Sequence, residues 1–127
     1  METMREALSR MTRIVVVRGG DVDPTPVKRR QRQLNEVIAH VDDPVALARL
    51  QPTLRLADVQ EDQVSWIAAP DCTLALYADS EYLGWVTPLG GEWVRSTWWA
   101  WDMRLREPER LPDWLDEHVP GWGRREL

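Results

Sequence analysis

Tryptophan and tyrosine are the residues of this chain best suited to recognition. The sequence contains eight Trp, two Tyr and no Phe, and five of the Trp lie between Trp85 and Trp101. Each Trp brings a large apolar area and one N–H that needs a hydrogen-bond partner when buried. The cluster is therefore either the core of a small sheet or an amphipathic surface that docks a partner.

Residue types that support catalysis or metal binding are present, but without the spacing of a known motif. His40 and His118 each lie beside two acidic residues, yet both clusters fall at expected helix ends, where charge and capping explain them. Cys72 follows Asp71 and lacks the cationic neighbours that lower the pKa of a thiol. We therefore expect no enzyme activity, no cofactor and no metal site.

A basic run near the N-terminus suggests a second kind of recognition. Residues 1–35 contain eight basic and four acidic groups, a balance of +4, whereas residues 36–127 have eight basic and seventeen acidic groups, a balance of −9. Such asymmetry is typical of a protein with an anionic partner, although the two parts could equally attract each other. Because exposed Lys and Arg bind phosphates, the candidate nucleic-acid contacts are Lys28, Arg29, Arg30 and Arg32.

The composition is that of one globular domain. The chain has 127 residues, 43% of them hydrophobic and 29% charged, which is ordinary for a soluble protein. The single Cys72 excludes an internal disulfide and fits a reducing compartment. The sequence shows neither a signal-peptide pattern nor a run of about 18 apolar residues, so we expect a cytoplasmic protein with no membrane partner.

The elements that must position these residues begin with a main helix at about 26–41. Thr25 can cap it with Pro26 at its first position, and its apolar residues follow a helical period. Residues 1–24 should form an N-terminal arm with a possible strand at 13–18, and residues 25–127 a single α+β domain. Short flanking helices are expected at about 44–51, capped by Asp43, and at 111–118.

Three short strands follow one another in the second half of the chain. The pattern predicts strands at 72–78, 82–87 and 92–101, with turns at Asp79-Ser80 and Gly90-Gly91. The predicted fold class is therefore α+β: an antiparallel sheet of three to five strands, centred on the meander 72–101 and packed against the main helix.

The two turns, if each contains two residues, divide the meander's side chains between two faces. The face toward the main helix would hold Cys72, Leu74, Leu76, Leu83, Trp85, Val94 and Trp98. The other face would be a shallow trough, with aromatic walls beside the small residues Ala75, Gly84 and Thr97. The partner-binding residues predicted there are Tyr77, Tyr82, Trp93, Arg95, Trp99 and Trp101.

The trough admits more than one occupant: a helix of the same chain, a partner protein or second subunit, or a stacked sugar or base. Together with the missing catalytic motifs, it predicts a small non-catalytic interaction or regulatory module that binds a protein partner or forms a homodimer. The alternative is a nucleic-acid-binding regulator that uses the basic helix 26–41. An enzyme or carbohydrate binder comes third.

Overall fold

In the part of the chain that the structure describes, a six-stranded antiparallel sheet is packed against three short helices. The computed structural model describes residues 2–19, 36–60, 71–89 and 92–122. Its elements are α1 (Met4–Arg10), β1 (Arg13–Arg18), β2 (Val37–Val41), α2 (Pro44–Thr53), β3 (Cys72–Ala78), β4 (Glu81–Leu89), β5 (Trp93–Ser96), β6 (Met103–Arg104) and α3 (Arg110–His118). The strand order is β2-β1-β3-β4-β5-β6. The α+β class is as predicted, but the sheet has six strands rather than three to five.

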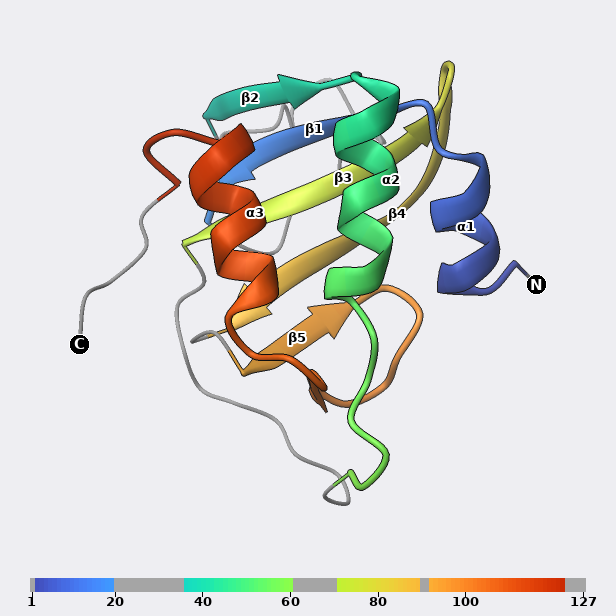
Figure 1. The fold of residues 1–127 in the computed structure, drawn as a ribbon. Coiled ribbons are helices and arrows are strands. Elements are labelled where there is room, and N and C mark those ends of the chain that lie inside the picture. The colour runs from blue at the N-terminus through green and yellow to red at the C-terminus, as the bar shows by residue number, and fades with distance from the viewer. Residues whose placement is uncertain (1, 20–35, 61–70, 90–91, 123–127) are drawn as a thin grey trace, which may run out of the picture.

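The helices form one layer over one face of the sheet. Figure 1 shows α2 and α3 side by side across the sheet, with α1 beyond α2. Leu8 of α1, Leu50 of α2 and Leu115 of α3 belong to one buried cluster, which also contains Ile14 of β1 and Leu74 of β3. The core therefore lies between the helix layer and this face. Within the described ranges, no helix is long and apolar enough to cross a membrane.

Helix α2 begins at the capping signal that the sequence predicts, and a tryptophan ties it to α3. The Asp43 side chain accepts a hydrogen bond from the backbone N–H of Ala46 (3.1 Å), and Pro44 occupies the first turn of α2. The helix continues to Thr53, slightly past its predicted end. Trp114 of α3 donates its indole N–H to the carbonyl of Ala46 at 2.9 Å, so a buried Trp both packs and ties the two helices together.

The predicted main helix is wrong over its last six residues, 36–41. Residues 37–41 form β2, which pairs antiparallel with β1 through Ile14↔Val41 and Val16↔Ala39. A short β-branched run fits a helical period and a strand equally well, and β1 supplies the ladder partner that decides it. Glu36 is not helical, and its carbonyl accepts a hydrogen bond from the backbone N–H of Arg18 (2.8 Å). Residues 26–35 of the predicted helix lie outside the described residues. Helices α2 and α3 take its expected place over the sheet.

The predicted register of the meander is correct at its first turn and wrong beyond it. Ala78 pairs with Glu81 and Tyr77 with Tyr82, but the register shifts between Leu76 and Tyr77. A shift of one residue exchanges the two faces of a strand. Leu74 therefore pairs with Val86, and Trp85 pairs with Ala75 instead of joining the core face.

The third strand of the meander is shorter than predicted. Leu89 pairs with Trp93 rather than with Glu92, and Val86 with Ser96 rather than Arg95. Strand β5 ends at Ser96, so residues 97–101 leave the sheet before the chain returns as β6. The predicted strand 92–101 is thus a four-residue strand followed by a loop.

Candidate interaction site

The aromatic residues predicted to share one trough lie in two separate places. Tyr77 and Tyr82 face each other beside the β3–β4 turn, with ring centroids 5.6 Å apart. The remaining four residues, Trp93, Arg95, Trp99 and Trp101, lie on β5 and in the loop that follows it. The structure thus brings the two tyrosines together but does not join them to the tryptophans in one ladder.

The small residues predicted as the floor of the trough are not open. Ala75 is 1% exposed. A Cβ atom built on Gly84 would lie 2.5 Å from Cη2 of Trp98, so the Trp98 ring rests directly on the Gly84 backbone. Thr97 lies in the loop after β5, and its hydroxyl oxygen accepts a hydrogen bond from the backbone N–H of Trp85 at 2.9 Å. The chain's own residues therefore fill the predicted trough.

The tyrosine pair is engaged by the strand beside it. The guanidinium of Arg13 lies over the Tyr77 ring, 4.1 Å from its centroid, and Arg13 Nε donates a hydrogen bond to the carbonyl of Asp79 (2.9 Å). A guanidinium over an aromatic face is attracted by the ring quadrupole. Desolvation raises the pKa of Tyr77, an effect that the nearby Arg13 charge opposes. The contacts of Tyr77 and Tyr82 within the chain are therefore sufficient to explain why the two tyrosines lie together, without a partner.

The loop at residues 97–102, called here the aromatic loop, is held by an ion pair at its base. Arg95 donates two hydrogen bonds to Asp102, Nε to Oδ1 at 2.8 Å and Nη2 to Oδ2 at 3.1 Å. This bidentate geometry is the strong form of the Arg–carboxylate interaction. Asp102 is only 3% exposed, and a carboxylate is buried to that extent only when it is paired. The pair closes the loop between β5 and β6.

Hydrogen bonds from backbone N–H groups hold the rest of the aromatic loop. The Ser96 hydroxyl oxygen accepts a hydrogen bond from the N–H of Trp98 (2.9 Å), and the N–H of Thr97 donates to the carbonyl of Trp85 (3.2 Å). Trp98 and Trp99 pack in part against the core. Trp101, in contrast, is 44% exposed. A loop with a fixed conformation therefore presents one large aromatic side chain to solvent.

Trp93 and Arg95 belong to this region but are not open surface. Trp93 is 7% exposed, and the guanidinium of Arg104 on β6 lies over its ring, 5.2 Å from the centroid. Arg95 forms an ion pair with Asp102. Of the six residues predicted to bind a partner, Trp101 is therefore the most exposed, and Arg95 and Asp102 hold the loop that carries it. Sequence reasoning missed Asp102, because nothing in the sequence indicates that residues 97–101 form a loop that brings it back to Arg95.

The structure does not support a functional role for the other candidate residues that it describes. Lys28, Arg29, Arg30 and Arg32 lie outside the described residues. Cys72 is buried, and desolvation raises its pKa to about 12, so its thiol is protonated near neutral pH and is a poor nucleophile. Within the described part of the chain, no group of three or more His, Cys, Asp or Glu residues is placed to hold a metal ion.

Comparison with known proteins assigns neither a family nor a function to this chain. No protein-family model matches the chain, and neither a curated protein nor a solved structure matches it. The function must therefore be argued from the contacts described above.

Proposed function

We propose that this protein is a small non-catalytic interaction module that binds a protein partner, or a second copy of itself, through the aromatic loop. Trp101 is the central contact and Trp99 an adjoining one. The observation that carries the proposal is the combination of an exposed Trp101 ring with a buried, bidentate Arg95–Asp102 pair at the base of its loop.

The arrangement is suited to binding for two physical reasons. Trp is among the residues that contribute most binding energy at protein interfaces, because it buries a large area with few rotatable bonds. A loop that is already ordered loses less conformational entropy on binding than a mobile one. The Arg95–Asp102 pair and the Ser96 hydroxyl impose that order before any partner arrives.

A protein suits this surface better than a sugar or a nucleic-acid base. Neither Trp99 nor Trp101 lines either of the two cavities described beside the helices. A small polar ligand normally needs a concave site with several convergent polar groups. A single exposed aromatic side chain on an ordered loop is instead typical of a protein–protein contact.

Site-specific photo-cross-linking tests the proposal. A benzoylphenylalanine replaces Trp101 in one variant and Val59 in a control variant, since Val59 is 82% exposed and lies outside the aromatic loop. We expect a cross-linked species that is specific to position 101, either a dimer of the pure protein or a discrete adduct in extract of the source cells. Equal labelling patterns at 101 and 59 would contradict the proposal.

The alternative proposal, nucleic-acid binding through Lys28, Arg29, Arg30 and Arg32, rests on the sequence alone. Residues 37–41 of the predicted helix belong to β2, and the four basic residues lie outside the described ranges. Fluorescence anisotropy with duplex and single-stranded DNA checks it. Affinity that falls steeply with added salt and is lost when the four residues are replaced by Gln would favour it, and no binding at low salt would exclude it.

A further inference from the structure

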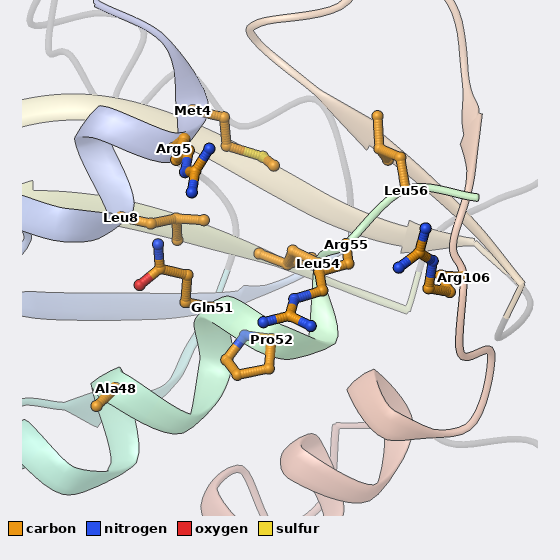
Figure 2. Close-up of a pocket in the computed structure, with 10 residues that line it drawn as sticks. All are labelled: Met4, Arg5, Leu8, Ala48, Gln51, Pro52, Leu54, Arg55, Leu56 and Arg106. Atoms are coloured by element: carbon orange, nitrogen blue, oxygen red, sulfur yellow. The ribbon is translucent and has the colours of Figure 1, made fainter. Parts of the chain in front are cut away.

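A cavity between α1 and α2 combines apolar walls with arginine side chains. Its volume is about 650 Å³, within the range of roughly 300–1,000 Å³ that is typical of small-molecule sites. Figure 2 shows Leu8 and Arg5 reaching into this region from α1, Leu54 and Arg55 from the end of α2, and Arg106 from the segment before α3. The cavity therefore has both an apolar surface and a cationic rim.

The charges around the cavity are unbalanced. Three of its lining residues are arginines, and none of the described residues that line it is acidic. Arg106 is paired with Asp58, but Arg5 and Arg55 are exposed and form no ion pair with any described residue. Unpaired positive charge is unexpected in a chain whose net charge is −5.

The other arginines of the described ranges emphasise this difference. Each of them contacts a carboxylate, a backbone carbonyl or an aromatic ring through its guanidinium. They are Arg10, Arg13, Arg18, Arg49, Arg95, Arg104, Arg106 and Arg110. Of the arginines that the structure describes, only Arg5 and Arg55 lack such a partner, and both line the same cavity.

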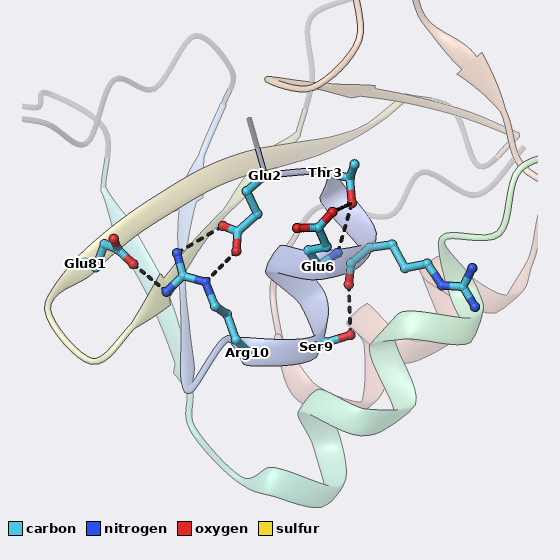
Figure 3. Close-up of polar contacts among 7 residues, drawn as sticks. Glu2, Thr3, Glu6, Ser9, Arg10 and Glu81 are labelled. Atoms are coloured by element: carbon cyan, nitrogen blue, oxygen red, sulfur yellow. Dashed lines mark hydrogen bonds and ion pairs between the residues drawn. The ribbon is translucent and has the colours of Figure 1, made fainter.

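The α1 wall of the cavity is anchored. Figure 3 shows Arg10 between Glu2, just before the helix, and Glu81 at the start of β4. The Thr3 hydroxyl oxygen caps the helix by accepting a hydrogen bond from the N–H of Glu6 (3.2 Å). A helix this short is marginal by itself, so these contacts help to hold Arg5 and Leu8 at the cavity.

We propose that this cavity binds a small organic anion that carries an apolar chain. Its carboxylate or phosphate group would lie between Arg5 and Arg55, because guanidinium groups bind both anions through paired N–H donors. The Gln51 side chain lines the same cavity and can donate a further hydrogen bond. The apolar chain would lie against Leu8, Leu54 and Leu56. This site shares no residue with the aromatic loop.

Isothermal titration with a matched set of probes tests the site. Octanoate and octyl phosphate carry both features, octanol carries only the chain, and inorganic phosphate carries only the charge. We expect saturable one-to-one binding of octanoate or octyl phosphate, and at least about tenfold weaker binding of octanol and inorganic phosphate, since each lacks one set of contacts. The preference between the first two probes identifies the anionic group. Absence of saturable binding by both would overturn the proposal.

Charge-neutralising variants locate the binding. Arg5→Gln and Arg55→Gln should each weaken binding of the preferred probe about tenfold. Arg18→Gln removes the same charge from the last residue of β1 and should leave the affinity unchanged. Equal losses in all three variants would show binding to overall charge and would overturn the site. Trp101→Ser should not alter anion binding, so failure here and failure of the proposed interaction function are separable.

Discussion

The two aromatic regions of the structure differ in what the neighbouring arginine contacts. At the β3–β4 turn, Arg13 lies over the Tyr77 ring and Tyr77 packs on Tyr82, so the guanidinium shields part of the Tyr77 ring, and both tyrosines are half-buried. At the aromatic loop, Arg95 turns to Asp102 and leaves Trp101 exposed. The comparison suggests a physical difference that can be tested: an arginine over an aromatic ring shields that ring, whereas an arginine paired with a carboxylate leaves the nearby Trp101 exposed.

The largest expected effect is at Gly84, where the aromatic loop meets the sheet. Gly84→Ala should lower the free energy of unfolding by about 2–4 kcal/mol, because the new Cβ would clash with Trp98 and because the backbone φ of +152° is unfavourable for alanine. Urea denaturation measures the change.

Gly121→Ala is the matched control for this prediction. Gly121 also has a positive φ, +81°, but nothing lies within 4 Å of a Cβ built there. The free energy of unfolding of Gly121→Ala should therefore fall only by the cost of backbone strain, about 1–2 kcal/mol. An equal fall in the free energy of unfolding of both variants would mean that Trp98 does not pack firmly on Gly84. The aromatic loop would then not be held against the sheet at this point.

The next effect concerns the ion pair that closes the loop. Asp102→Asn should lower the free energy of unfolding by about 1–3 kcal/mol, since it removes a charge partner of Arg95 at a buried position. Asp58→Asn breaks an exposed pair with Arg106 and should change stability by less than about 1 kcal/mol. Thermal or urea unfolding of both variants measures the two changes in stability. Equal changes would mean that the buried Arg95–Asp102 pair contributes no more to stability than the exposed one.

A smaller effect is expected at the tyrosine region. Desolvation raises the pKa of Tyr77, while the charge of Arg13 lowers it, so Arg13→Gln should raise the Tyr77 pKa further. Ultraviolet titration of the phenol, assigned with a Tyr77→Phe variant, measures this shift. An unchanged pKa would mean that Arg13 does not cover the ring in solution, and the contrast between the two regions would fail.

The smallest effect is a local pH response of α1. The hydrogen bond from Arg10 lowers the pKa of Glu2 below its ordinary value. This contribution to the order of α1 is therefore present above the ordinary pKa of the carboxyl group and is lost as the pH falls through the lowered one. The protection of the α1 amides, taken relative to the exchange rate of an unstructured chain at the same pH, should fall below about pH 4. Arg10→Gln should remove that pH dependence while leaving β3 and β4 protected.

Local signals in the sequence predict the local structure well. The Asp43-Pro44 cap predicts α2, the β-branched run predicts β1, and the Asp79-Ser80 turn predicts the pairing of Tyr77 with Tyr82. Each depends on residues close together in the chain. The α+β class follows from these elements and does not require the correct register.

The errors come from interactions between distant residues. Strand β2 exists because β1 pairs with it, which no periodicity within residues 37–41 reveals. The bulge beside Tyr77 exchanges the faces of β4, so Trp85 leaves the core face and Val86 joins it. The aromatic loop depends on Asp102 returning to Arg95. The cavity that Arg5 and Arg55 both line depends on how α1 packs beside α2. Such contacts are set by tertiary packing, which outweighs local preference.

The central claim is that the Arg95–Asp102 pair holds the aromatic loop in a conformation that binds a partner through Trp101. The most direct measurement compares the yield of the position-101 cross-link between the otherwise unchanged chain and its Asp102→Asn variant, with near-ultraviolet circular dichroism to verify that both are folded. We expect the Asp102→Asn variant to keep its fold and to lose most of the specific cross-link. A specific cross-link of equal yield in the folded variant would contradict it.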